Sequence, residues 1–241
     1  MKIRVITPST MREKVARSLE QYSAAARSDT QLSADVLDKG PESVDSVYDE
    51  AMAVADTVKK IETAEQEGIQ AVISNCMLDP GVLPAREKVS MPVLGPAESS
   101  MHIAAMLADR FSVVTILDAL IPAFENHALK LGLFDQLASV RAVSMRGADL
   151  DDQERLQEAI EEQAAKAVEE DGAHIIVLGC TAMRGLAMDV EEGLRNRGIT
   201  GVPVIDPALL ALKLAEAFVD MGLSHSKLTY PEPPQQEIIG F

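Results

Sequence analysis

The two cysteines of the sequence, Cys76 and Cys180, are the residues whose type and spacing best suit chemistry. Each follows a short aliphatic stretch, residues 71–74 and 175–178, that predicts a β-strand, and each precedes a stretch of helical character. Ligands of open parallel sheets bind beyond the carboxyl ends of the strands, where backbone amides and helix dipoles stabilise a thiolate. A free cysteine is often only a small buried hydrophobe. Two at matching positions, with none elsewhere, favour a chemical role.

Two thiols that face one carbon from opposite sides suit a single reaction type. A thiolate removes the proton from a carbon next to a carbonyl, and a thiol on the other face returns a proton, which inverts the centre. Asn75 and Thr181, which are neighbours of the two cysteines, offer hydrogen bonds and backbone amides to the developing oxyanion. We therefore predict a racemase or epimerase that works without a cofactor.

The elements that must position the cysteines occur twice along the chain. Two long predicted helices, residues 48–67 and 151–170, are each followed by a glycine, which is the usual residue just past a helix C-terminus. Cys180 follows Cys76 by 104 residues. The other matching segments are the predicted strands 2–7 and 111–115, the runs 91–96 and 202–207, and the apolar helices 97–107 and 208–221.

Alternating helices and short apolar strands predict parallel sheets covered on both faces. Because the pattern is duplicated, we predict an α/β fold of two pseudo-symmetric Rossmann-like lobes with mostly parallel sheets and an active site in the interlobe cleft. The expected domains are residues 1–108, the first lobe with Cys76; residues 109–206, the second lobe with Cys180; and residues 207–241, a C-terminal helix and tail that packs back on the first lobe.

Composition excludes several other classes of function. The formal net charge of −16 argues against nucleic acid as a partner, because phosphate binding needs clustered Lys and Arg. No apolar run is long enough to span a membrane, and the first residues lack the pattern of a signal peptide, so we expect a cytoplasmic protein. The four histidines show no metal-ligand spacing, so we expect no metal. The expected partner is a small-molecule substrate, and the sequence leaves room for a homo-oligomer.

Two short motifs surround the cysteines. Residues 76–81 read Cys-Met-Leu-Asp-Pro-Gly, and residues 178–183 read Leu-Gly-Cys-Thr-Ala-Met. They resemble the motifs C-F-G-D-P-G and L-G-C-(A or T)-G-M of the aspartate/glutamate/hydantoin racemase family, specifically its hydantoin and allantoin racemase branch. Further segments that resemble the family are residues 40–41, 48–50, 97–102 and 110–115, so the resemblance covers almost the whole chain.

The resemblance implies two lobes with the active site between them, Cys76 and Cys180 as the acid/base pair, and neither pyridoxal phosphate nor a metal. It also implies that the following residues hold the polar end of the substrate: Thr7, Ser9, Pro41, Asn75, Met77, Thr115, Thr181 and Ala182. Ser9 and its neighbour Thr10 are equally suited to be helix N-caps, and a helix N-terminus is itself an anion site, so both roles stay open.

The sequence departs from the family pattern at several places. The opening N-P-N reads Thr-Pro-Ser at residues 7–9, Leu78 and Ala182 stand in place of glycines, and Ile116 replaces a threonine. Each change adds apolar bulk or removes an amide near the expected pocket, where a five-membered ureido ring needs donors and acceptors. The reaction type is therefore better defined than the substrate, which is a hydantoin, an allantoin-like compound or an amino acid.

Two other functions are compatible with the same residues. In a maleate-type cis-trans isomerase, the first cysteine adds to the double bond and the second protonates it, and Arg184 is placed either to pair a second carboxylate or simply to face solvent. A decarboxylase of the same superfamily is a further variant. The alternative from another class is a non-catalytic small-molecule binding protein with two facing lobes.

Overall fold

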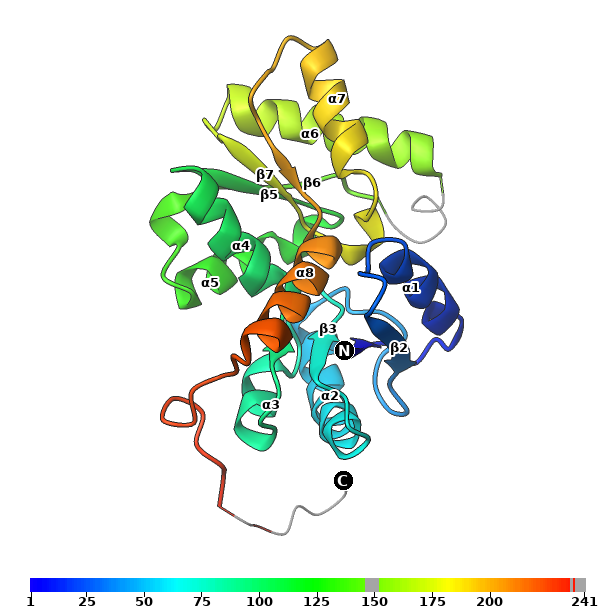
Figure 1. Cartoon of the computed structure of the whole chain (residues 1–241). Coiled ribbons are helices and arrows are strands. Elements are labelled where there is room, and N and C mark those ends of the chain that lie inside the picture. Colours follow the sequence, from blue (N-terminus) through cyan, green and yellow to red (C-terminus); the bar gives the residue numbers. More distant parts are fainter. Residues whose placement is uncertain (146–151, 235, 237–241) are drawn as a thin grey trace. The chain divides into compact units, whose positions relative to one another are not determined.

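The computed structural model describes residues 1–145, 152–234 and 236 of the chain. Contacts divide the chain into two compact units, which are followed by colour in Figure 1. Unit 1 comprises Met1–Gly95 and Ala211–Phe241, and unit 2 comprises Pro96–Leu210. Asp151, the first residue of one predicted helix, and most of the tail beyond residue 234 lie outside the described residues. Within those residues, no helix is long and apolar enough to cross a membrane.

Each unit contains a four-stranded parallel sheet. The sheet of unit 1 has the order β2-β1-β3-β4 and consists of β1 (Lys2–Thr7), β2 (Gln31–Val36), β3 (Ala71–Ser74) and β4 (Val93–Leu94). The sheet of unit 2 has the order β6-β5-β7-β8 and consists of β5 (Phe111–Thr115), β6 (Leu137–Ala142), β7 (Ile175–Leu178) and β8 (Val204–Ile205). The two orders are the same, which confirms the predicted duplicated α/β fold.

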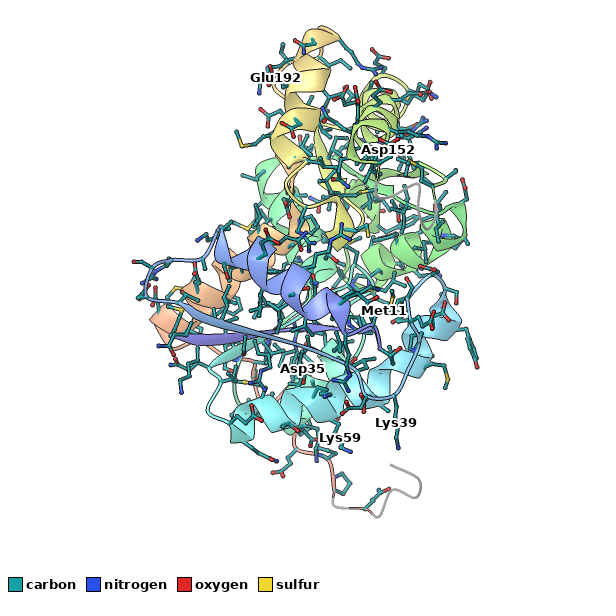
Figure 2. All side chains as sticks on the ribbon, turned by 90° about the vertical axis from the view of Figure 1, so that its right-hand side faces the viewer. Met11, Asp35, Lys39, Lys59, Asp152 and Glu192 are labelled. Atoms are coloured by element: carbon teal, nitrogen blue, oxygen red, sulfur yellow. The ribbon has the colours of Figure 1, made fainter. Side chains whose placement is uncertain are left out.

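Helices cover both faces of the sheet in unit 1. Figure 2 shows α1 (Glu13–Ser23) on one face and α2 (Val47–Gln66) on the other, and α3 (Val82–Lys88) packs beside α2. The core on the α2 side joins Ile6 and Val72 of the sheet to Ile61 of α2 and Ala85 of α3. All residues of β3 are buried, as expected for a strand covered on both faces.

The helices of unit 2 follow the same plan. Helices α6 (Gln153–Glu169) and α7 (Ala187–Asn196) pack against each other, with α6 on β5, β6 and β7 and α7 on β8, while α5 (Ile121–Lys130) packs on β6. Short 3-10 turns occur at Asp118–Leu120 (η1), Phe134–Gln136 (η2) and Thr181–Met183 (η4). Gly68 and Gly172, which follow the two long helices, have φ of 77° and 73°, so the predicted glycine helix ends are confirmed.

Two helices, α4 and α8, belong wholly or in part to a different unit from the strand that precedes them in the chain. Helix α4 (Pro96–Leu107) follows β4 of unit 1 but packs against β5 and β7 of unit 2. Helix α8 (Pro207–Met221) follows β8 of unit 2, but its residues from Ala211 onward belong to unit 1. The repeat in the sequence placed the end of the first copy at residue 108, whereas contacts place α4 with unit 2.

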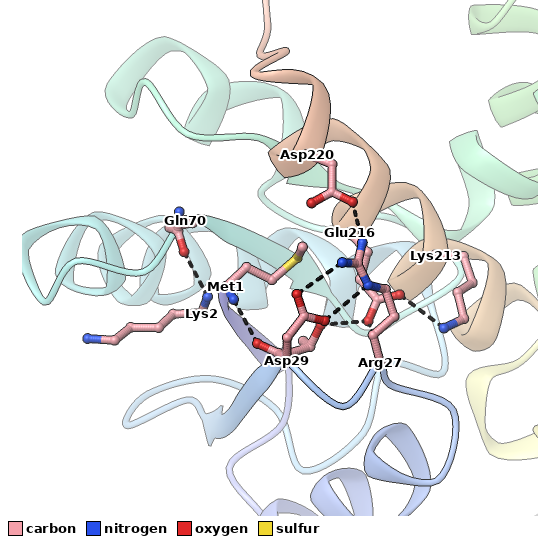
Figure 3. A network of polar contacts seen from close by, with 9 residues as sticks. Met1, Lys2, Arg27, Asp29, Gln70, Lys213, Glu216 and Asp220 are labelled. Carbon is pink, nitrogen blue, oxygen red and sulfur yellow. Dashed lines mark hydrogen bonds and ion pairs between the residues drawn. The ribbon is translucent and has the colours of Figure 1, made fainter.

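A buried carboxylate fixes α8 to unit 1. Figure 3 shows Glu216, which is 2% exposed, on the side of α8 that faces the loop between α1 and β2. Its carboxylate accepts hydrogen bonds from the Arg27 backbone N–H at 2.9 Å, the Thr30 hydroxyl at 2.8 Å and the Lys213 ammonium at 3.0 Å. The Arg27 guanidinium also pairs with Asp220. These donors offset the cost of burying the charge.

Candidate active site

The strand order reverses once in each sheet, and the cysteines lie at those points. The chain leaves β1 for β2 on one side and later returns to β3 on the other, so the switch point of unit 1 lies between β1 and β3. Thr7 ends β1, and Cys76 comes two residues after β3. In unit 2, Thr115 ends β5, and Cys180 comes two residues after β7. Crevices at such switch points are the usual ligand sites of open α/β sheets.

Behind Cys76, a buried chain of polar groups spans the switch point of unit 1. The Asn75 backbone N–H donates to the Ile6 carbonyl at 2.8 Å, and its side-chain Nδ2 donates to the Thr7 hydroxyl at 3.2 Å. The Tyr22 hydroxyl donates to Asn75 Oδ1 at 2.8 Å, and the Thr7 and Ser18 hydroxyls are 3.2 Å apart. Thr7 and Asn75, two of the predicted substrate-binding residues, are therefore brought together, whereas Tyr22 and Ser18 were missed by sequence reasoning.

The turn after Cys76 differs from the expected arrangement. We expected a helix immediately after the cysteine, but α3 begins only at Val82. The Asp79 N–H donates to the Cys76 carbonyl at 3.1 Å, and the Ser74 hydroxyl holds the Pro80 carbonyl at 2.8 Å. Asp79 has a left-handed φ of 52°, which ends the turn before a helix can form. The amides near the half-buried Cys76 thiol therefore belong to this turn.

Ser9 and Pro41 lie in two loops that are bonded to each other. The Ser9 hydroxyl donates to the Glu42 carbonyl at 2.6 Å and accepts from the Met11 N–H at 3.2 Å. The Thr10 N–H donates to the Pro41 carbonyl at 3.0 Å. The N-cap of α1 is Arg12, without a side-chain cap, so the helix-capping role left open for Ser9 and Thr10 is wrong. These side chains instead hold the loop after β1 against the segment that precedes α2.

In unit 2, the Cys180 thiol itself takes part in a turn. Cys180 is the N-cap residue of η4, and its Sγ accepts a hydrogen bond from the Ala182 N–H at 3.4 Å. A donor aimed at sulfur favours the thiolate over the thiol. Thr181 and Ala182 both lie in η4 and are half-buried, so the predicted residues around Cys180 form one short segment. Arg184 ends η4 and is half-buried.

Thr115 carries a buried hydroxyl that needs a partner. The residue is fully buried, and its Oγ1 has no hydrogen-bond partner among the described residues. It lies beside Gly179, where an added Cβ would come within 2.8 Å of the Thr115 Cα, so glycine is required for this close approach of β5 and β7. A buried hydroxyl without a partner is costly and is typical of a place where a ligand or water binds.

The remaining site predictions concern side chains and metals. Met77 is buried, and the strong hydrogen-bonding groups that it brings to the turn after Cys76 are those of its backbone. Leu78 and Ile116, two of the departures from the family pattern, are also buried. Across the described residues, no group of three or more His, Cys, Asp or Glu side chains is arranged to hold a metal ion.

The class of fold is defined by two α/β units, each with a parallel sheet and a cysteine at the switch point of that sheet. Comparison with known proteins gives the family. The family model for Asp/Glu/Hydantoin racemase matches residues 3–215, and the chain belongs to this family. It is therefore an isomerase of the racemase type.

Relatives match the chain over its full length. The hydantoin racemase of Pseudomonas sp. (strain NS671) is 39% identical over 242 residues, which cover 100% of this chain and 95% of that protein. The structure of the allantoin racemase from Klebsiella pneumoniae matches with a TM-score of 0.89 at 32% identity, covering 100% of this chain and 96% of that one. The allantoin racemase from Pseudomonas fluorescens matches with a TM-score of 0.90 at 33% identity, covering 100% of both chains.

Proposed function

We propose that this protein interconverts the enantiomers of a 5-substituted hydantoin or of allantoin, with Cys76 and Cys180 as the acid/base pair and without a cofactor. The observation that carries the proposal is the equivalent position of the two cysteines, one at each switch point of two sheets with the same strand order. The full-length similarity to hydantoin and allantoin racemases supports the choice of substrate class.

The proposed reaction takes place at the ring carbon C5, which carries one hydrogen and is bonded to a ring carbonyl. The thiolate of Cys76 takes this proton, and the electron pair of the C–H bond moves onto the carbonyl as an enolate. The thiol of Cys180 then gives its proton to the opposite face of C5. The product has the inverted configuration, Cys76 is a thiol and Cys180 a thiolate. The opposite enantiomer reacts in the reverse sense.

Hydrogen-bond donors are proposed to hold the ring and the enolate oxygen. The unpartnered hydroxyl of Thr115 is the strongest candidate in unit 2, and the backbone amides of Thr181 and Ala182 lie beside Cys180. In unit 1 the candidates are Thr7 and Asn75 together with the Met77 backbone. Ser9 and Pro41 contribute by fixing the loop after β1, because their polar groups bond to each other's loops.

Solvent exchange tests the proposal directly. Single enantiomers of a 5-substituted hydantoin and of allantoin are incubated with the protein in D₂O, and deuterium at C5 is followed together with loss of optical rotation. We expect both signals from the unaltered protein and a loss of racemisation of at least about a hundredfold in Cys76→Ser and in Cys180→Ser. Thermal unfolding of each variant serves as the control for folding.

Three outcomes would contradict parts of the proposal. Racemisation that persists in both serine variants would rule out the two-thiol mechanism, because inversion needs both thiols even where one thiol alone still exchanges the proton of one enantiomer. Absence of exchange with every hydantoin would favour a binding protein. A succinyl adduct on Cys76 after incubation with maleate would favour the cis-trans isomerase.

A further inference from the structure

Tyr22 differs from the other tyrosines of the chain in its burial and in its partner. It is 1% exposed, whereas Tyr48 is exposed and Tyr230 is half-buried. Tyr22 lies in the last turn of α1, and its hydroxyl donates a hydrogen bond to the side-chain oxygen of Asn75 at 2.8 Å. Asn75 is separated from Tyr22 by 53 residues in sequence and directly precedes Cys76.

The Tyr22 hydroxyl determines which way the Asn75 amide faces. Because the phenolic O–H donates to Oδ1, the amide NH₂ is turned toward the Thr7 hydroxyl, 3.2 Å away. Thr7 ends β1 and Asn75 follows β3, so this pair spans the switch point. Tyr22 donates to Asn75, and Asn75 in turn donates to Thr7. Without the tyrosine O–H, this buried amide oxygen loses that donor, which weakens the preference for this orientation of the amide.

We propose that Tyr22 is a positioning residue for the reaction at Cys76. It acts through Asn75, whose amide orientation keeps hydrogen-bond donors, rather than the amide oxygen, at the unit 1 switch point. This inference rests on the proposed function, because those donors are the ones assigned to the substrate ring. Tyr22 is 1% exposed and its hydroxyl donates to Asn75, so we assign it no contact with substrate.

The variant Tyr22→Phe tests this role because it removes a single oxygen and leaves the ring in the core. We expect kcat/KM for racemisation to fall about tenfold, the usual scale for losing one hydrogen bond that orients a site. In an Asn75→Ala background the same substitution should cost less than about twofold, because the amide on which it acts is gone. Equal losses in both backgrounds would show that Tyr22 contributes only packing, which overturns the inference.

Tyr230→Phe is the matched control. It also removes one tyrosine oxygen from unit 1, where that oxygen accepts a hydrogen bond from Arg86 at 3.3 Å. We expect this variant to change kcat/KM by less than about twofold. A fall as large as that of Tyr22→Phe would overturn the specific role of Tyr22.

Alkylation of the thiols provides a readout that needs no substrate. The rates at which iodoacetamide modifies Cys76 and Cys180 are measured separately by mass spectrometry of peptides. We expect Tyr22→Phe to change the rate at Cys76 by at least about threefold and to leave Cys180 unchanged. If this shift occurs while the unaltered protein racemises nothing, the positioning role stands and the proposed function fails. If the unaltered protein is active and neither kcat/KM nor the Cys76 rate responds, the positioning role fails.

Discussion

One carboxylate oxygen of Asp206 accepts a hydrogen bond from the Gly185 N–H at 2.7 Å. The other oxygen accepts from the Ala208 and Leu209 N–H groups, at 3.0 Å and 3.1 Å, at the start of α8. Asp206 therefore ties the turn that follows Cys180 to the first turn of a helix. It is buried, so its geometry is set by these donors.

Replacing Asp206 with Asn should loosen the turn that carries Cys180. An asparagine has one oxygen, so either the bond to Gly185 or the two bonds to α8 must be lost. We expect a loss of about 1–2 kcal/mol in the free energy of unfolding and about a tenfold fall in racemisation kcat/KM. Asp189→Asn, an exposed change on α7, is the control, and comparable losses in both variants would contradict the role of Asp206.

In unit 1, a carboxylate also lies at the position that corresponds to Asp206, but it belongs to Asp79 in the turn after Cys76. Gly95 matches Asp206 in the repeat, and a Cβ on Gly95 would lie 2.3 Å from the carboxylate of Asp79. The change Gly95→Ala should therefore destabilise the protein by about 1–3 kcal/mol through overpacking. In an Asp79→Gly background the carboxylate is absent and glycine accommodates the left-handed φ. The loss of unfolding free energy caused by Gly95→Ala should then be less than half of its value in the unaltered protein. Urea denaturation measures both, and equal costs would argue against this contact.

The attachment of α8 should depend on pH through Glu216. Burial by itself raises the pKa of Glu216, but the donors from Arg27, Lys213 and Thr30 lower it overall. A carboxyl whose pKa is lower in the folded state stabilises the protein above its unfolded pKa, and this contribution is lost as pH falls through the folded value. We expect Glu216→Gln to cost about 1–3 kcal/mol at pH 7 and progressively less in acid.

Hydrogen exchange of α8 amides should reveal where that stability is lost. In Glu216→Gln we expect reduced protection of the helix from Ala211 onward, with little change in β5 and β7. Glu191→Gln removes an exposed pair with Arg195 and serves as the control. A uniform loss of protection over both units would show that Glu216 does not act locally.

A second acid-sensitive pair lies in unit 2. Arg141 on β6 bonds both oxygens of Asp171, at 2.6 Å and 2.9 Å, and this guanidinium holds the pKa of Asp171 below its usual value. The stabilisation is therefore complete above the unfolded pKa of an aspartate and disappears as pH falls through the folded value. A lysine at position 141 cannot form this bidentate contact. For Arg141→Lys we therefore expect a loss of about 1 kcal/mol in the free energy of unfolding at pH 7, and a weaker dependence of stability on pH in acid. An unchanged pH dependence in thermal unfolding would contradict this.

The central strands could be predicted from the sequence because both of their faces are buried. In β3 and β7 every residue is apolar or small, and the predicted bounds are those observed. The edge strands β2 and β6 escaped prediction because they are mostly half-exposed and carry polar residues such as Gln31 and Asp35. Their place in the sheets is set by pairing with β1 and β5 rather than by their own pattern.

For the candidate site, sequence reasoning found residues attached to strand ends and missed those that act through a distant partner. Thr7 and Thr115 end the first strands of the two units, where the β-branched runs of the repeat stop, and their binding role came from the resemblance to the family. Tyr22 was missed because nothing in the local sequence indicates that its hydroxyl reaches Asn75. The turn at Asp79 was missed because a left-handed φ is uncommon outside glycine, and the neighbour of its carboxylate, Gly95, is distant in the sequence.

The place of α8 in unit 1 has a consequence for synthesis on the ribosome. Unit 1 begins to be made first but is completed last, because it needs the residues from Ala211 onward. Unit 2 is continuous from Pro96 to Leu210 and is synthesised in full before the residues from Ala211 onward. Until then the Arg27 and Thr30 donors of the nascent chain lack the Glu216 carboxylate that they bond in the finished protein. Nascent chains that stop before α8 therefore hold one complete sheet and one unit that still lacks its last helix, the kind of incompletely packed intermediate that is prone to aggregate.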